Sequence, residues 1–237
     1  MTDRSTILRE IGLTPIWSLR GTAQPPVSDA VAAPTDATRA EPAIQSDPNR
    51  ETSIAAMSWE ELVTSIAHCT ACKLSTTRTQ TVPGVGDRSP AWMVIGEAPG
   101  ENEDKQGEPF VGKAGQLLDA MLAAVGKKRT QGVFIANVIK CRPPGNRNPE
   151  PDEIAACAPY LKRQIALASP KLLLAAGKFA AQTLLNRDDT VAAMRASGGQ
   201  FAGIPVVVTY HPSYLLRSPL EKGKAWDDLL KARAIVA

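Results

Sequence analysis

The sequence predicts an α/β fold, a three-layer sandwich in which a central four-stranded parallel sheet lies between two layers of helices. Two observations predict it. Short runs of apolar residues alternate along the chain with longer segments in which apolar residues recur every three or four positions. Continuous apolar runs are typical of parallel strands that are buried on both faces, and such strands need helical connections.

Each element can be placed from its own signals. We expect strands where the apolar runs fall, at residues 92–95, 133–139, 172–174 and 204–209. We expect helices from the capping box of Ser58 and Glu61, from Pro151, and at residues 115–125, 179–185 and 220–234.

The 237 residues divide into three parts. Residues 57–237 carry the strand and helix signals and form one domain. Residues 21–56 contain no Leu, Phe, Tyr or Trp, so we expect a disordered linker that cannot bury enough apolar surface to fold. Residues 1–20 include apolar side chains at near-helical spacing, which is typical of a short docking peptide. The alternative is that this peptide packs back on the domain.

Composition excludes several classes of protein. The longest apolar runs are far shorter than the roughly 20 residues that a membrane span needs. The first residues lack the apolar stretch of a secretory signal, so we expect a cytoplasmic protein. A formal net charge of +3 permits contact with nucleic acid without requiring it. Four cysteines are too few for a disulfide scaffold in a chain of this size.

Polar side chains follow three of the predicted strands. Glu97 lies in a loop rich in Gly and acidic residues after the first strand, Asn137 lies near the end of the second, and His211 follows the fourth. Ligands of an open parallel sheet bind beyond the carboxyl ends of its strands. We therefore expect acid, amide and imidazole groups at one edge.

The four cysteines have a spacing that favours metal binding. Cys69 and Cys72 form a C-x2-C pair, and Cys141 and Cys157 follow at a strand end and on the next helix. Four thiolates around one centre suit either zinc or an iron–sulfur cluster. The alternatives are four unrelated buried thiols, or His68 as a competing ligand, although a helix-end position fits His68 better.

Together these motifs resemble the family-4 uracil-DNA glycosylases, the iron–sulfur branch of that superfamily. The resemblance runs from about Trp59 to the C-terminus. It rests on the cysteine spacing and on the segments GEAPGENED from Gly96, PFVGKAGQLL from Pro109, NVIKCRPPGNRNP from Asn137 and HPSYLLR from His211. It implies hydrolysis of the N-glycosidic bond of deoxyuridine in DNA, which initiates base excision repair, and a [4Fe–4S] cluster on Cys69, Cys72, Cys141 and Cys157. The partner is then uracil-containing DNA, and the location is cytoplasmic and nucleoid-associated.

The resemblance also implies roles for individual residues. Glu97 would orient the attacking water, and His211 would stabilise charge on the departing base. Asn137 would read uracil and Phe110 would stack on it. The substrate-binding residues are then Gly96, Ala98, Gly100, Glu103, Phe110 and Asn137.

Two positions depart from the family-1 enzymes of the same superfamily. Those enzymes carry an Asp where this chain has Ala98, so the attacking water falls to Glu97 and the backbone. They use an aromatic residue at the position of Gly100 to exclude the thymine methyl group. Glu103 is expected to exclude it here.

DNA contacts are expected from both sides of the site. The target base must leave the stack, because its glycosidic carbon is unreachable inside a duplex. Leu215 is expected to act as a wedge that fills the vacated space. The DNA-binding residues are Arg142, Ser213, Leu215 and Arg217, with further phosphate contacts from Lys113, Lys140 and Arg147.

Three other functions fit parts of the sequence. A relative that traps the uracil site covalently carries a histidine in an inserted basic loop and another in place of the third cysteine, whereas this chain has Cys141. A non-catalytic uracil-DNA-binding module would not need Glu97, Asn137 and His211 together. A zinc hydrolase would need an open metal position, which four thiolates do not leave.

The N-terminal segment suggests a replication partner. Residues 11–20 resemble the N-terminal peptide of the psi subunit of bacterial DNA polymerase III, which docks on the chi subunit. The tether would then raise the local concentration of the enzyme at replication forks. We expect the protein to be a monomer.

Overall fold

The computed structural model describes residues 48–236. Its strands are β1 (Val85–Gly86), β2 (Trp92–Gly96), β3 (Val133–Asn137), β4 (Leu172–Ala176), β5 (Gly199–Phe201) and β6 (Ile204–Thr209). Its α-helices are α2 (Pro48–Ala56), α3 (Trp59–Ala67), α4 (Glu101–Gln106), α5 (Gly112–Ala124), α6 (Pro151–Ala168), α7 (Lys178–Leu185), α8 (Val191–Ser197), α9 (Pro212–Arg217) and α10 (Lys222–Val236). Short 3-10 turns lie at Lys73–Thr76, Pro144–Asn146 and Pro219–Glu221.

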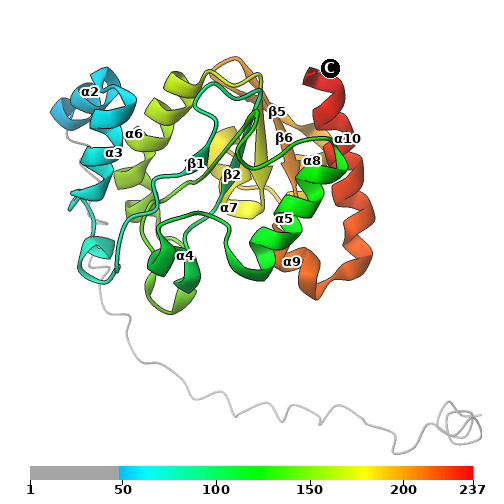
Figure 1. Cartoon of the computed structure of the whole chain (residues 1–237), viewed down its shortest axis with the longest axis horizontal. Helices are drawn as coiled ribbons and strands as arrows, with labels where there is room; N and C mark the ends of the chain where they lie inside the picture. Colours follow the sequence, from blue (N-terminus) through cyan, green and yellow to red (C-terminus); the bar gives the residue numbers. More distant parts are fainter. Residues whose placement is uncertain (1–47, 237) are drawn as a thin grey trace, which may run out of the picture. The chain divides into compact units, whose positions relative to one another are not determined.

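The sheet of the described part is mixed and has six strands, in the order β1-β3-β2-β4-β6-β5. It lies between α6 on one side and α5 and α10 on the other (Figure 1). The four middle strands are parallel and coincide with the four apolar runs. The edge strands β1 and β5 are antiparallel to their neighbours. The expected four-stranded sheet was therefore too small. Both edge strands are very short and contain glycine, so they leave no apolar run in the sequence.

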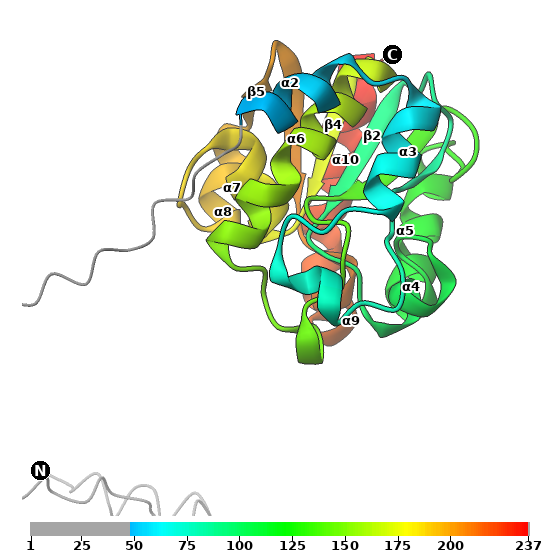
Figure 2. The ribbon, with the colours of Figure 1, turned by 90° about the vertical axis from the view of Figure 1, so that its left-hand side faces the viewer.

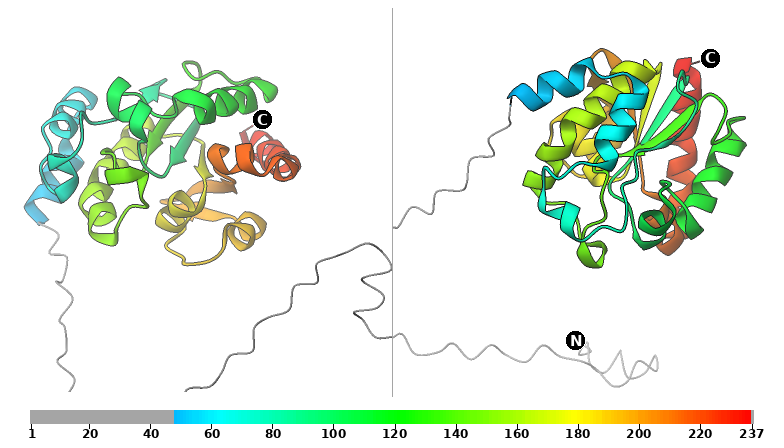
Figure 3. Two further views of the ribbon diagram at one scale, coloured as in Figure 1. Left: turned by 90° about the horizontal axis from the view of Figure 1, so that it is seen from below. Right: turned by 60° about the vertical axis from the view of Figure 1, so that its left-hand side comes forward.

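Alternate residues of the parallel strands face two separate apolar cores. Met93, Ile95 and Leu173 face one core, which is shared with α3, α6, α7 and α8. Trp92 and Val94 face the other, which is shared with α5, α9 and α10. Helices accordingly lie on both sides of the sheet (Figures 2 and 3), which is the expected three-layer arrangement. None of these helices combines the length and the apolar character that a membrane crossing requires.

Several helix signals are confirmed. The Ser58 hydroxyl accepts from the Glu61 amide, and the Glu61 carboxylate accepts from the Ser58 amide, so the capping box opens α3. Pro151 is the first residue of α6. Helix α5 begins at Gly112, earlier than the expected residue 115. The short helices α4, α8 and α9 were not expected, because each has too few residues to show a periodic apolar pattern.

The predicted linker, residues 21–56, was wrong at its end. Residues 48–56 form α2, which packs against α6 (Figure 2). The helix holds one large apolar side chain, Ile54, and that side chain is buried in the first core. A single isoleucine among Ala, Thr and Ser gave no amphipathic pattern. The rest of the linker and the docking peptide, residues 1–20, lie outside the described residues.

Candidate active site

The parallel strands end together at one edge of the sheet. Gly96 is the register partner of Asn137, and Ala176 is the partner of Thr209. The chain visits these strands in the order β2, β3, β4, β6, so the direction of winding reverses between β2 and β4. Open α/β sheets bind ligands at this reversal, beyond the carboxyl ends of the strands.

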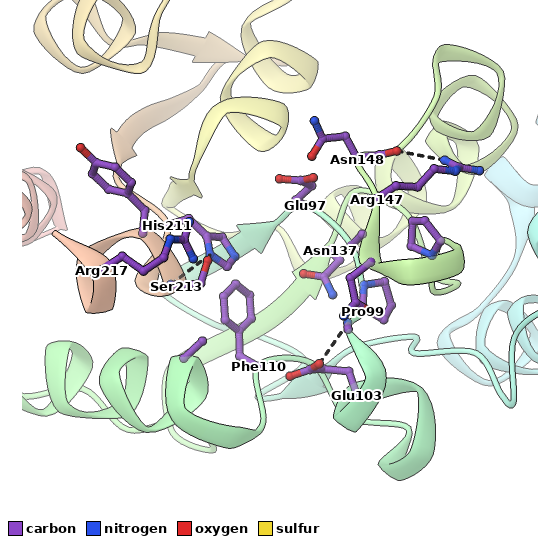
Figure 4. A pocket seen from close by; sticks show the side chains of 16 residues that line it. Glu97, Pro99, Glu103, Phe110, Asn137, Arg147, Asn148, His211, Ser213 and Arg217 are labelled. Atoms are coloured by element: carbon purple, nitrogen blue, oxygen red, sulfur yellow. Dashed lines mark hydrogen bonds between the residues drawn. The ribbon is translucent and has the colours of Figure 1, made fainter. Parts of the chain in front are cut away.

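A pocket of about 540 Å³ lies at this edge. Nine of the predicted site residues line it: Glu97, Ala98, Gly100, Glu103, Phe110, Asn137, His211, Ser213 and Arg217. Figure 4 shows that the side chains of Glu97, Phe110, Asn137 and His211 surround the same space. Asn146 and Asn148 also line the pocket, although the sequence analysis assigned them no role. Their position within the segment that follows Asn137 was the available signal.

His211 is held as a neutral imidazole. The Ser213 amide donates to its Nδ1 at 3.2 Å, and the Ser213 hydroxyl lies 2.7 Å from the same nitrogen (Figure 4). Since a backbone amide can only donate, Nδ1 carries no proton and the proton of the neutral ring is on Nε2. Burial, and secondarily the charge of Arg217, lower the pKa of His211 to about 4. The ring is therefore a neutral hydrogen-bond donor at physiological pH.

Gly177, at the end of β4, supports this histidine. Its φ is +99°, and a Cβ there would lie 3.0 Å from the His211 Cβ. Its amide donates to the Thr209 carbonyl at 2.9 Å, which ties the end of β4 to the end of β6. Gly177 was not predicted from the sequence, because a glycine after an apolar run is typical of an ordinary turn.

Glu97 follows directly after β2. Burial raises the pKa of its carboxyl group to about 7. The Glu97 carbonyl accepts from the Ile139 amide, and the Gly96 carbonyl accepts from the Val138 amide, so the backbone here is fixed by the continuation of β3. A carboxyl group that titrates near neutral pH and faces a pocket is suited to general-base chemistry.

Asn137 is buried at the floor of the pocket, at the end of β3. Its backbone carbonyl accepts from the Lys140 ammonium at 2.6 Å. Lys140 is itself fully buried, and burial lowers its pKa to about 8. The expected phosphate contact from Lys140 is therefore wrong, since its side chain points into the protein and secures the strand that carries Asn137.

Phe110 forms one wall and stacks on His211, with ring centroids 5.4 Å apart and an angle of 28° between the planes. Gly96 does not line the pocket but leaves room for this wall. A Cβ at Gly96 would lie 2.4 Å from the Asn137 Oδ1 and 2.5 Å from the Phe110 ring. Gly96 therefore contributes by lacking a side chain.

Glu103, on α4, is engaged by two backbone amides. Its carboxylate accepts from the Gly100 amide at 3.0 Å and from the Val111 amide at 2.9 Å. A Cβ at Gly100 would lie 2.7 Å from the same carboxylate. Glu103 thus joins the loop after β2 to the loop before α5, and its carboxylate forms part of the pocket wall.

Leu215 is not available as a wedge. Its side chain is only 1% exposed and belongs to the second core. Because α9 begins at Pro212, successive residues turn by about 100° around the helix axis, and Leu215 faces inward. Its neighbour Leu216 faces outward and is 41% exposed. The periodicity of so short a helix gave no basis for choosing between the two leucines.

Arginines surround the mouth of the pocket. Arg217, on α9, lines it and is exposed. Arg142 does not line it; its guanidinium donates to Asn146 at 2.8 Å and lies 3.6 Å from the carboxylate of Glu101. Arg147 lines it and donates to the fully buried carboxylate of Glu153, which fixes the loop between β3 and α6.

The four cysteines line a second, much smaller cavity of about 10 Å³. The guanidinium of Arg78 lies 3.1 Å from the Cys141 Sγ, and that of Arg50, on α2, lies 3.8 Å from the Cys69 Sγ. His68 is the C-cap of α3 and bonds the Thr64 carbonyl, so it is a helix-end residue as expected. Within residues 48–236, no group of His, Cys, Asp or Glu side chains is close enough to hold a single metal ion.

The donor set nevertheless fits a thiolate-bound centre. Without a metal, burial favours the neutral thiols: it raises the pKa of Cys141, and it raises the pKa of Cys157 to about 12. A metal centre supplies the positive charge that favours thiolates, and the cations Arg50, Arg78 and Lys140 stand around the sulfur atoms.

Comparison with known proteins agrees with this geometry. Residues 83–230 match the family model described as the uracil DNA glycosylase superfamily. The chain is 41% identical over 182 residues to a type-4 uracil-DNA glycosylase of Archaeoglobus fulgidus, which covers 73% of this chain and 91% of that protein. It is 41% identical over 187 residues to that of Sulfurisphaera tokodaii, covering 75% and 84%.

A bacterial relative gives the same match. The type-4 uracil-DNA glycosylase of Thermotoga maritima is 39% identical over 176 residues, which cover 72% of this chain and 91% of that protein. The family model spans more than half of the chain, and the relatives are matched over most of their own length. The chain therefore belongs to the uracil DNA glycosylase superfamily.

Proposed function

We propose that this protein excises uracil from DNA. Water adds to the C1′ carbon of deoxyuridine as the bond from C1′ to N1 breaks. Glu97 accepts the proton that the water loses, and uracil departs as an anion that takes up a proton from solvent. The abasic site that remains in the DNA begins base excision repair. The observation that carries the proposal is the convergence of Glu97, Asn137 and a neutral His211 on one pocket. The type-4 glycosylases named above support the substrate.

Recognition requires a base that has left the stack. The Asn137 amide offers one donor and one acceptor, which match O4 and the N3 hydrogen of uracil. The Phe110 ring offers a face for stacking. The carboxylate of Glu103 and the backbone at Gly100 form the wall that excludes a methyl group on C5.

Departure of the base places negative charge on uracil O2. The Nε2 hydrogen of neutral His211 donates to that oxygen, and the two contacts from Ser213 fix the ring in the required tautomer. Ser213 is thereby a positioning residue. Its expected contact with DNA stays a prediction.

Glu97 orients the water and favours the positive charge that develops on the sugar. With a pKa of about 7, roughly half of the free protein carries the ionised carboxylate at neutral pH. Ala98 lines the pocket beside it and leaves space for the water. No other carboxylate is needed for the step.

DNA is held at the mouth of the pocket. Arg217 and Arg142 contact phosphates, with Arg147 and the exposed Lys113 adding charge. Leu216, in place of Leu215, fills the space that the flipped base leaves. It lies on α9, five residues after His211 and on the outer face of that helix.

Cys69, Cys72, Cys141 and Cys157 would hold a [4Fe–4S] cluster. When bound, the cluster supplies a covalent cross-link between the segment after α3, the segment after β3 and helix α6. The hydrolysis transfers no electrons, so we assign the cysteines a structural role. They fix the start of the loop that carries Arg142 and Arg147.

The N-terminal peptide is proposed to dock on the chi subunit of DNA polymerase III through residues 7–20. This proposal rests on the sequence resemblance of residues 11–20 alone. If Trp17→Ala leaves the amount of chi recovered in a pull-down unchanged, this proposal is wrong. We further propose a monomer that acts in the cytoplasm at the nucleoid.

The function is tested by incubating the protein with oligonucleotides that contain a single uracil or, at the same position, thymine. We expect free uracil to be released from the first and no base from the second, together with iron in the purified protein. Binding of uracil-DNA without release would support the non-catalytic module instead. A stable covalent adduct would support the trapping alternative.

A further inference from the structure

The backbone at Phe110 has a conformation that is unusual for an aromatic residue. Its φ is +53°, in the left-handed region that disfavours residues with bulky side chains. Such a conformation persists only where the surrounding structure enforces it. The Phe110 ring is a wall of the pocket, so whatever holds this backbone also sets the position of the wall.

Arg129 fixes the backbone at Phe110 from outside the pocket. It lies in the turn before β3, and its Nη1 donates to the Pro109 carbonyl at 2.8 Å while its Nη2 donates to the Phe110 carbonyl at 2.7 Å. Its Nε donates to Asp119 on α5 at 3.0 Å. One guanidinium therefore binds two consecutive carbonyls and is itself oriented by a carboxylate.

The Phe110 carbonyl also packs closely against Gly115 at the start of α5. A Cβ at Gly115 would lie 1.7 Å from that oxygen, so only glycine fits beneath it. At the other end of the same peptide, the Val111 amide donates to Glu103. The peptide after Phe110 is thus held by Arg129 at its carbonyl and by Glu103 at its amide, and the peptide before Phe110 is held by Arg129 at the Pro109 carbonyl.

We infer that Arg129 is a positioning residue of the pocket, which fixes the Phe110 ring as the stacking wall for the base. Asp119 orients its guanidinium. The inference rests on the proposed function, because it assigns the ring a base as its ligand. Lysine cannot replace Arg129, since a single ammonium lacks the planar fork that reaches two carbonyls at once.

The test is a double-mutant cycle with Arg129→Ala, Phe110→Ala and the combined variant. We measure KM and kcat on a single-uracil oligonucleotide, and the inhibition constant of free uracil. Removal of the Arg129 guanidinium should raise KM and the uracil inhibition constant by about tenfold, because the Phe110 ring is displaced. It should change kcat by less than about twofold, because the reacting groups stay in place. In the Phe110→Ala background, Arg129→Ala should change either constant by less than about twofold.

Two further variants sharpen the result. Arg129→Lys should resemble Arg129→Ala, whereas Arg187→Ala should behave as wild type, because Arg187 pairs with Asp189 and does not line the pocket. Equal effects of Arg129→Ala in both backgrounds would show a general structural role and overturn the inference. Full activity of Arg129→Lys would also overturn it.

A second readout does not depend on activity. Hydrogen exchange of the amides in residues 108–113 should become faster in Arg129→Ala and stay unchanged in Arg187→Ala. Unchanged exchange in Arg129→Ala would overturn the inference even if the wild type did not excise uracil. If the wild type fails to release uracil but exchange is faster in Arg129→Ala, the proposed function is refuted. The role of Arg129 in holding the backbone at Phe110 then still stands.

Discussion

The pocket and the cysteine cavity are built in opposite ways, although one short stretch of chain contributes to both. Asn137 ends β3 in the pocket, and Cys141 lies four residues later in the cavity. The pocket has about 540 Å³, and burial shifts the pKa values of Glu97 and His211 towards their proposed tasks. The cavity has about 10 Å³ and places cationic side chains against sulfur. The first region is suited to a reaction and the second to holding the fold together.

This difference predicts two kinds of variant. Substitutions in the pocket should lower the rate of uracil release and leave the melting temperature almost unchanged. Substitutions in the cavity should lower the melting temperature and the iron content, with little effect on the rate per folded, iron-loaded molecule. A pocket variant that loses iron, or a cavity variant that loses rate at full iron content, would contradict this division.

Glu97→Gln should have the largest effect on the rate. We expect kcat/KM to fall by about a thousandfold, because the amide cannot accept a proton from water. In the wild type, kcat/KM should rise with pH through about 7, since only the ionised carboxylate is active and burial has raised its pKa to that value. The variant should lack this limb. Glu101→Gln, which changes an exposed carboxylate at the start of α4, should match the wild type in both rate and pH profile.

His211→Ala should have the next largest effect. Loss of one preorganised donor to the departing base should lower kcat by about a hundredfold. Because the pKa of His211 is about 4, no loss of activity from protonation of this ring should occur between pH 6 and pH 8. The chain has one other histidine, His68, which is exposed, and His68→Ala should leave kcat unchanged. Equal losses in the two variants would contradict the assigned role.

The two adjacent leucines of α9 separate DNA contact from core packing. Leu216→Ala should lower kcat/KM on duplex DNA by about tenfold and leave the melting temperature unchanged, since its side chain is exposed. Leu215→Ala should lower the free energy of unfolding by about 2–5 kcal/mol, since its side chain is in the core. Duplex assays and thermal melts of both variants measure this, and the reverse pattern would restore Leu215 as the wedge.

Cys72→Ser should have the smallest effect on the rate. The variant should lose iron and should melt more than about 5 °C below the wild type, because the proposed cluster would join segments that are distant in the sequence. Among molecules that retain iron, the rate should stay within about threefold of wild type. Thr70→Ser, a change at an exposed neighbour, should preserve iron, melting temperature and rate. A large loss of rate at unchanged iron content would place the cysteines in the reaction.

Apolar runs and the polar residues at their ends were the features that could be predicted from the sequence. The four parallel strands are continuous apolar runs, and Glu97, Asn137 and His211 stand at their ends, so the pocket was predictable from order and polarity. The edge strands and α2 escaped prediction, because they hold almost no large apolar residues. Gly177 was not predicted either, because its role depends on close packing against His211, which follows a different strand.

Side-chain direction was the other limit. Lys140 and Leu215 carry the residue types expected at a DNA surface and a wedge, but both point into the protein. Which of two neighbouring residues faces outward depends on where a short helix or turn begins, and a six-residue helix gives too short a pattern to decide.

In the proposed reaction, the pocket alone carries out the excision. The direct measurement compares uracil release by the wild type and by the Asn137→Ala, His211→Ala double variant, with thermal melting and iron content recorded for both. We predict release by the wild type only, with the same melting temperature and iron content in both proteins. Release by the double variant at a rate close to that of the wild type would show that Asn137 and His211 are not needed for the excision.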